Sequence, residues 1–180
     1  MKLVVPNENP DLDGAASTFA YAEFLKKTDK ELEENDETAT GAVFGDLTEK
    51  TEEILEEIEE EISDASYYLY SADDIVLISA SSTKNMTTRI APDRVKEILD
   101  HENISSDDFP NAELIIEEDF NSAAAIVGKM FRDHEVEDEE EEELEISRQS
   151  ATLLIEAIKH EEDANENDKE ILEWLEEEME

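Results

Sequence analysis

The sequence predicts an α/β fold with a mainly parallel, twisted sheet, helices on both of its faces and a helical C-terminal part. Three observations lead to this prediction. Strand-like and helix-like segments alternate through the first two thirds of the chain, and two more helix-like segments follow. Hydrophobic residues make up 38% of the 180 and gather in short runs that can form one core. Because parallel strands need long, usually helical connections, such alternation is typical of a parallel sheet.

The first third of the chain contains two predicted strand–helix pairs. The apolar run KLVV predicts a strand at 2–5, and the spacing of apolar residues predicts a helix at 14–34. The segment TATGAVFG predicts a second strand at 38–45, which a glycine ends. The acidic segment 46–62 places isoleucine and leucine on one face and therefore predicts an amphipathic helix.

The middle of the chain predicts three strands and one helix. The aromatic residues of SYYLY favour a strand at 66–70, and DDIVLISAS at 73–81 has the strongest buried-strand pattern of the chain. A proline in the first turn of APDRVKEILDH predicts a helix at 91–101. The segment AELIIEED predicts another strand at 112–119.

The last third is predicted to be helical apart from one acidic run. A helix is expected at 121–133, with Asn121 or Ser122 as its N-cap, and two amphipathic helices are expected at 147–160 and 165–179.

The domain organisation predicted from these elements is a single domain. Residues 1–134 form its α/β core, and 147–180 add helices to the same domain. The acidic run at 135–146 is a solvated connector, because it has few apolar residues that could anchor it.

Composition limits the partners that this chain can have. With 54 acidic and 14 basic residues, the formal net charge is −40. A field of this sign repels nucleic acids and anionic membranes, so neither is an expected partner. There is no cysteine for a disulfide or a thiolate metal site, and no segment is typical of a signal peptide or a membrane span. We expect a cytoplasmic protein.

The acidic residues are spread over nearly every predicted helix rather than gathered in one tail. Because salt screens the repulsion between surface charges, this spread predicts adaptation to a salt-rich cytosol, as in halophiles. The alternative is an acidic interaction protein, such as a chaperone of basic partners.

The stretch NENPDLDGAAS at 7–17 places two carboxylates, Asp11 and Asp13, in a turn between a predicted strand and a predicted helix. An aspartate at this point can cap the helix, since its side chain accepts hydrogen bonds from the free N–H groups of the first turn. It can also hold a metal ion, since hard cations prefer carboxylate oxygens. The residues alone leave both interpretations open.

The expected parallel sheet places three parts of the chain close together. Ligands of parallel α/β sheets bind at the carboxyl ends of the strands, near the point where the strand order reverses. The loop after the first strand contains Asp11 and Asp13, and the loop at the end of the run IVLIS holds Ser79 to Ser82. His101 ends the segment 91–101, where it could also interact with the end of a helix.

Four motifs follow one another in the order found in the DHH phosphoesterase superfamily: NPDLDG, IVLISAS, ILDH and NSAAAIV. The segments YAEFLKK, AVFGD and SRQSATLLIEAI with NDKEILEWL are similar to archaeal members, and the resemblance covers roughly 1–175. The superfamily includes manganese-dependent pyrophosphatases, exopolyphosphatases and RecJ-type exonucleases. Its members carry a second, substrate-binding domain, which we do not expect in these 180 residues.

The resemblance implies a site of two divalent cations that clamp phosphate oxygens and activate a water. Asp11 and Asp13 match its paired aspartates, and Asp100 and His101 match the first two residues of its Asp-His-His motif. It therefore implies Asp11, Asp13 and His101 as ligands of Mn²⁺ or Mg²⁺, and Asp100 and His101 as the catalytic pair, with Asp100 orienting His101. Weaker candidates for the metal are Asn7, Ser79 and His160. The phosphate of a substrate is expected near Glu102, Asn121 and Ser122.

Three departures from the superfamily pattern weaken the implied site. Ser79 stands where the carboxylate that bridges the two cations belongs, Asn7 stands where the pyrophosphatases have a histidine, and His160 is close to the place of an aspartate. We therefore expect at most one cation.

Two functions remain open from the sequence. One is a phosphoesterase of reduced activity on pyrophosphate, polyphosphate or short phosphodiesters, with a small phosphate-containing ligand as its partner. The other is a non-catalytic binding domain that has kept the fold. A protein partner or a homodimer is compatible with both.

Overall fold

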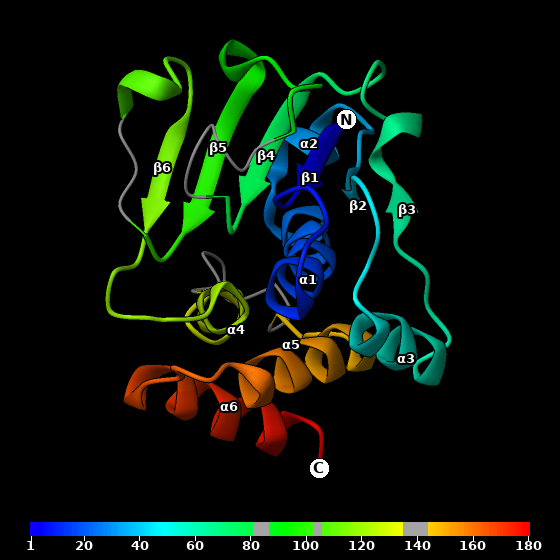
Figure 1. Cartoon of the computed structure of the whole chain (residues 1–180). Coiled ribbons are helices and arrows are strands. Elements are labelled where there is room, and N and C mark those ends of the chain that lie inside the picture. The colour runs from blue at the N-terminus through cyan, green and yellow to red at the C-terminus, as the bar shows by residue number, and fades with distance from the viewer. Residues whose placement is uncertain (81–86, 103–105, 135–143) are drawn as a thin grey trace.

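The computed structural model describes residues 1–80, 87–102, 106–134 and 144–180. Six strands form one sheet in the order β3-β2-β1-β4-β5-β6, and every neighbouring pair is parallel (Figure 1). Their bounds are Lys2–Val5 (β1), Ala39–Val43 (β2), Ser63–Asp64 (β3), Asp74–Ile78 (β4), Val95–Asp100 (β5) and Glu113–Ile116 (β6). The predicted fold class, a parallel α/β sheet with a helical C-terminal part, is confirmed.

The strand order reverses between β1 and β4. From β1 the chain steps outward to β2 and β3, then returns to β4 and steps the other way to β5 and β6. Because crossovers between parallel strands are right-handed, the two series of connections lie on opposite faces of the sheet. The carboxyl ends of β1 and β4 therefore meet at the point where ligands of such folds bind.

The two faces are covered by different kinds of helix. One face carries the α-helices (Figure 1): α1 (Leu12–Thr28), α2 (Lys30–Glu34), α3 (Glu49–Glu57), α4 (Ala123–Arg132), α5 (Arg148–His160) and α6 (Glu166–Glu178). The other face is covered by turns that include three short 3₁₀ helices, at Ala65–Tyr67, Pro92–Arg94 and Ser106–Asp108.

Successive residues of each strand are buried on opposite faces of the sheet. Val4 and Val76 pack under the α-helices, whereas Leu3 and Leu77 pack under the turns. Since both faces are covered, the central strands β1 and β4 are apolar along most of their length, as in other parallel sheets. Gly41 of β2 lies so close to α1 that a Cβ there would sit 2.7 Å from the carbonyl oxygen of Thr18.

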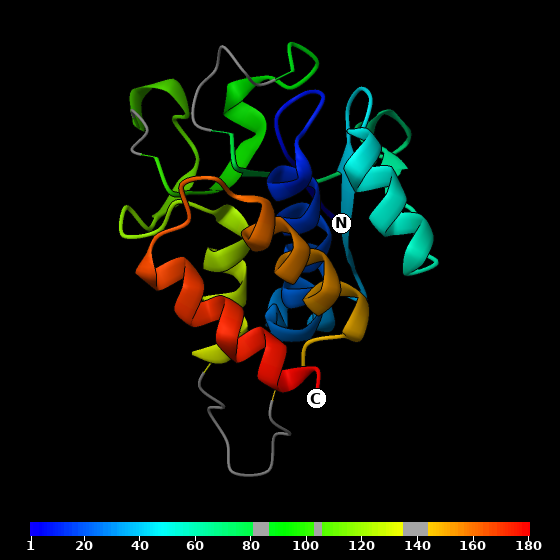
Figure 2. The ribbon, with the colours of Figure 1, turned by 60° about the horizontal axis from the view of Figure 1, so that its bottom comes forward.

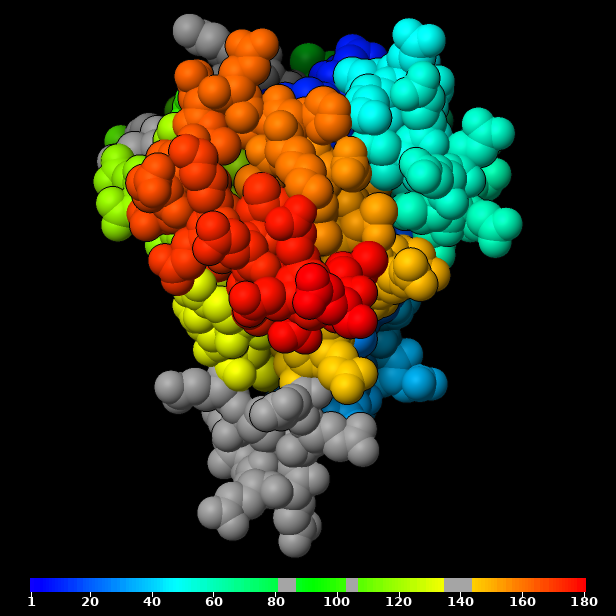
Figure 3. All heavy atoms as spheres, turned by 90° about the horizontal axis from the view of Figure 1, so that it is seen from below, coloured from blue at the N-terminus to red at the C-terminus, as the bar shows by residue number. Residues whose placement is uncertain are grey.

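The α-helices form two layers below the sheet. Helices α1 and α4 contact strands, and α5 packs on both of them. Helix α6 packs on α4 and α5 and lies outermost, as Figures 2 and 3 show from below. Of the described helices, none is both long and apolar enough to cross a membrane.

The prediction of a helix at 91–101 is wrong. Pro92 starts a 3₁₀ turn, and the chain continues as the strand β5, which pairs with β4 and β6. Ile98 and Leu99 are adjacent in sequence but are buried on opposite faces of the sheet. A strand covered on both sides does not alternate apolar and polar residues, so its pattern can be mistaken for a helix.

Two other predicted elements differ from the structure. Residues 66–70 are not a strand, because they form the end of a 3₁₀ helix and a turn. Tyr67 and Tyr70 are 81% and 95% exposed. Since β propensity reflects packing on a half-buried sheet, it does not determine the structure of these exposed residues. The helix expected at 46–62 is shorter, at Glu49–Glu57. Most of the predicted connector at 135–146 lies outside the described residues.

Candidate functional site

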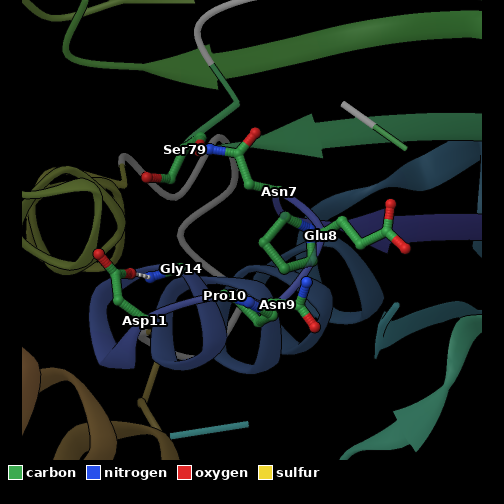
Figure 4. Close-up of a pocket in the computed structure, with 8 residues that line it drawn as sticks. Asn7, Glu8, Asn9, Pro10, Asp11, Gly14 and Ser79 are labelled. Carbon is green, nitrogen blue, oxygen red and sulfur yellow. Dashed lines mark hydrogen bonds between the residues drawn. The ribbon is translucent and has the colours of Figure 1, made fainter. Parts of the chain in front are cut away.

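Asn9 in the loop after β1 is hydrogen-bonded to the residues that follow β2. The backbone N–H of Asn9 donates to the Phe44 carbonyl (2.8 Å), and its side-chain oxygen accepts from the Asp46 N–H (2.9 Å). Gly45 makes this contact possible, because it has a φ of +83° and a Cβ there would lie 2.1 Å from the Asn9 side-chain oxygen. Asp11 then caps α1 by accepting from the Gly14 N–H at 2.9 Å (Figure 4).

A hydrogen bond joins the loops after β1 and β4 across the point where the strand order reverses. The Asn7 amide donates to the Ser79 carbonyl at 2.8 Å, and Ser79 has a left-handed backbone with a φ of 51°. Figure 4 shows Asn7 turned toward Ser79 and away from Asp11. The Asn7 Oδ1 atom is buried and has no hydrogen-bond partner among the described residues.

The Asp13 carboxylate is buried at the N-terminus of α4. Its Oδ1 accepts from the Ser122 hydroxyl (2.6 Å) and the Ala124 N–H (3.0 Å), and its Oδ2 accepts from the Ala123 N–H (3.0 Å). Burial raises the pKa of this carboxyl to about 6, although these three hydrogen bonds act in the opposite direction.

Asp100 is the last residue of β5, and His101 follows it. One oxygen of Asp100 accepts from the N–H groups of His101 (2.7 Å) and Glu102 (3.1 Å), while Oδ2 is buried without a hydrogen-bond partner among the described residues. Burial raises the pKa of Asp100 above its usual range. The His101 Nδ1 lies 3.5 Å from Asp100 Oδ1 but makes no hydrogen bond with it, so the contact is an ion pair only when the ring is protonated.

These elements enclose a cavity of about 680 Å³ at the carboxyl edge of the sheet. Its lining comes from five separate segments of the chain: Asp11, Asp13, Ser79, His101, Glu102, Glu118, Phe120, Asn121, Glu161 and Asp163. Six of these ten side chains are carboxylates, and none is a lysine or an arginine, as far as the structure describes the lining. A phosphate group would therefore be repelled here unless a cation accompanied it.

Comparison with known proteins identifies the family. The model of the DHH family N-terminal domain matches residues 2–158. The chain belongs to the DHH family. No curated protein matches this DHH domain significantly.

Solved structures share the fold of this DHH domain at low sequence identity. A Methanococcus jannaschii protein assigned to the family II inorganic pyrophosphatases superposes with a TM-score of 0.70 and 18% identity, over 98% of this chain and 55% of that one. An exopolyphosphatase-related protein from Bacteroides fragilis gives a TM-score of 0.62 and 14% identity, over 99% of this chain and 53% of that one. The DHH domain thus spans about half the length of these structures.

The cavity brings together most, but not all, of the residues expected from the sequence. Asp11, Asp13, Ser79, His101, Glu102 and Asn121 line it. Asn7 lines an adjoining pocket of about 340 Å³, which shares Asp11 and Ser79 with the cavity. The ring of His160 is half exposed at the end of α5, where its Nδ1 contacts the Glu156 carbonyl at 2.8 Å. The roles expected for these residues stay predictions.

Two residues expected near a phosphate have internal partners instead. The Asn121 amide donates to the Asp163 carbonyl at 2.6 Å, and its backbone N–H donates to both oxygens of Asp168 at 3.2 Å. Ser122 has no exposed surface, and its hydroxyl is used by Asp13 and by the Ala125 N–H. In this arrangement both side chains support the wall of the cavity.

Sequence reasoning missed three acidic residues that line the cavity. Glu118 lies after β6, and Glu161 and Asp163 lie between α5 and α6. None belongs to a recognisable motif, and among the 54 acidic residues of the chain nothing in the sequence distinguishes these three as site residues. Only the packing of α5 and α6 against α4 brings the two segments together.

The donor set of the cavity is of the kind that a hard divalent cation accepts. Carboxylates and an imidazole are the ligands that Mn²⁺ and Mg²⁺ accept, and the cavity offers both kinds. The sequence resemblance predicts a carboxylate between two cations at the position of Ser79, so one cation stays the prediction. In the described ranges, no three histidine, aspartate or glutamate side chains are already arranged to hold a metal ion.

Proposed function

We propose that this domain binds one Mn²⁺ or Mg²⁺ in the acidic cavity and, through that cation, a small phosphate-containing ligand. The function would be that of a metal-dependent phosphoesterase of reduced activity, acting on pyrophosphate, polyphosphate or a short phosphodiester. The observation that carries the proposal is the cavity itself. It lies beside the switch point of the sheet and combines carboxylates with His101, and its described lining has no lysine or arginine.

Asp11, His101 and Glu102 are the residues that would hold the cation. Asp11 is exposed and lines the cavity, and among the described residues its side chain accepts only the capping hydrogen bond from Gly14, through Oδ1. Asp100 would keep His101 in position, since the two are adjacent at the end of β5 and 3.5 Å apart. When bound, the cation would offset the charge of the phosphate and polarise a water.

Calorimetric titration of Mn²⁺ into the whole chain in molar KCl tests the proposal. We expect one site, weakened at least about tenfold in Asp11→Asn and in His101→Gln, because each removes one ligand. The matched control is Glu33→Gln, which removes an exposed carboxylate on α2. Methylene diphosphonate, a pyrophosphate analogue that resists hydrolysis, should bind only when Mn²⁺ is present.

Phosphate release from pyrophosphate, tripolyphosphate and a dinucleotide then separates the substrate classes. A release rate that depends on Mn²⁺ and falls in Asp11→Asn supports the enzyme. Absence of Mn²⁺ binding at millimolar concentration would overturn the proposal.

A non-catalytic interaction domain is the second candidate function. The observation that favours it is that Asn7 and Asp13, two expected metal ligands, already have protein partners. Metal-independent folding together with metal-independent capture of a purified protein partner would support this alternative.

A further inference from the structure

The first three residues of α4 each have a hydrogen-bond acceptor for their free backbone N–H group. Ala123 and Ala124 donate to Asp13, and Ala125 donates to the Ser122 hydroxyl at 3.2 Å. These are three of the four N–H groups that have no partner within the helix when Ser122 is its N-cap. The N–H groups of Ala123, Ala124 and Ala125 are therefore not free to bind a phosphate.

The position of Asp13 explains how this is achieved. It lies in the first turn of α1, and its side chain reaches the start of α4, which is 110 residues further along the chain. Asp13 is only 7% exposed, and three donors share its two oxygens. A carboxylate has about four lone pairs to offer, so most of its capacity is already used. The positive end of the α4 dipole adds to the attraction.

Asp11, two residues earlier, is in a different situation. It is exposed, and its Oδ1 accepts one hydrogen bond from the Gly14 N–H within its own turn. The two aspartates of the motif NPDLDG therefore differ in role although they look equivalent in sequence.

We infer that Asp13 is the anchor that holds the N-terminus of α4 on α1, and that it is not a cation ligand in this chain. The motif then supplies a single cation ligand, Asp11. This disagrees with the two-cation arrangement that membership of the DHH family implies, and it agrees with a serine at position 79. Only the statement about Asp11 rests on the proposed function, because the anchor itself needs no cation.

The variants Asp13→Asn and Asp11→Asn form a matched pair, since each removes one charge with almost no change of shape. In Asp13→Asn the side-chain NH₂ group faces Ser122, Ala123 and Ala124, which are themselves hydrogen-bond donors. Helix α4 therefore loses part of its anchor. We expect the Tm of the chelator-treated chain to fall by about 5–10 °C, and the amide hydrogens of Ala123 and Ala124 to exchange at least about tenfold faster. A single Mn²⁺ site should remain, within about threefold of its original affinity.

Asp11→Asn should give the opposite result. Asparagine caps a helix about as well as aspartate, so the Tm should change by less than about 2 °C, while Mn²⁺ binding weakens at least about tenfold. If Asp13→Asn does not fold, Ser122→Ala removes one of the three donors and should produce a smaller change of the same kind.

Two results would overturn the inference. One is an unchanged Tm and unchanged amide exchange in Asp13→Asn. The other is loss of Mn²⁺ binding in Asp13→Asn but not in Asp11→Asn. If the unmodified chain binds no Mn²⁺, the proposed function fails, while Tm and exchange in the absence of metal still decide whether Asp13 is the anchor.

Discussion

Ser79 is a non-glycine residue with a left-handed backbone at the end of β4. Such conformations are uncommon, they are several times more frequent for aspartate and asparagine than for other residues, and they gather at functional sites. The sequence resemblance predicts an aspartate at this position. The backbone at Ser79 is therefore one that an aspartate would also tolerate.

The substitution Ser79→Asp tests directly whether this position can contact a cation. We expect Ser79→Asp to bind Mn²⁺ about tenfold or more tightly than the unmodified chain, because a hard cation gains a charged oxygen ligand in the cavity. The measurement is the dissociation constant by calorimetry in molar KCl. Ser79→Asn is the matched control, since asparagine also tolerates the backbone but brings no charge. Equal affinities of the two variants would show that position 79 does not contact the cation.

At the scale of elements, α1 organises the helices that follow it in sequence. Asp13 in its first turn holds α4, and Glu23 nearer its other end holds the N-terminus of α5. Glu23 accepts from the Ser147 N–H (2.8 Å) and from the hydroxyls of Ser147 and Ser150, and it pairs with Lys27 at 2.7 Å. Partial burial would raise the pKa of Glu23, but these partners outweigh it and lower the pKa below its usual value.

The Glu23 contacts predict a pH-dependent contribution to stability. Since folding lowers the pKa of this carboxyl, its contribution is complete above the unfolded value, about 4.5, and disappears as the pH falls through the folded value. We expect Glu23→Gln to lower the Tm at pH 7 by about 4–8 °C, and this difference to shrink in acid. Thermal melts of both proteins at a series of pH values measure the effect.

Glu33→Gln serves again as the control, because its carboxylate is exposed and its removal changes the net charge equally. A difference in Tm that stays constant from neutral to acid pH would contradict the role of the Glu23 charge.

The same elements show what could be predicted from the sequence. Strands β1, β2, β4 and β6 and helices α1 and α3 to α6 were predicted, because each has a local pattern of apolar residues. Strand β5 was mistaken for a helix because its burial on both faces depends on neighbours that are distant in sequence. Asp11, Ser79 and His101 could be placed in one site by fold logic alone. The partners of Asp13 could not, since capping of one helix by another is a tertiary contact.

At the scale of the whole molecule, charge is the dominant property. A formal net charge of −40 on 180 residues opposes compaction, and the described ion pairs involve few of the 54 acidic residues. We propose that the protein works in a salt-rich cytoplasm, where this repulsion is screened. The same charge makes a nucleic acid or an anionic membrane an unfavourable partner.

Salt should therefore stabilise the fold. We expect the Tm to rise by about 10 °C between low and molar KCl, because the screening length falls from about 10 Å at 0.1 M to about 3 Å at 1 M. Sucrose at matched osmolality is the control, since it stabilises folded proteins without screening charge. A Tm that does not depend on KCl would refute the adaptation.

Two carboxylates of α1 contact residues that come much later in the chain, so these contacts can form only late in folding. Asp13 meets Ser122 across 109 positions, and Glu23 meets Ser150 across 127. Contacts between such distant parts of a chain form slowly, because a long loop must close first. On the ribosome, α1 is synthesised long before either partner exists. The acidic cavity can therefore take shape only after Asp163, the last residue of its described lining, has been made.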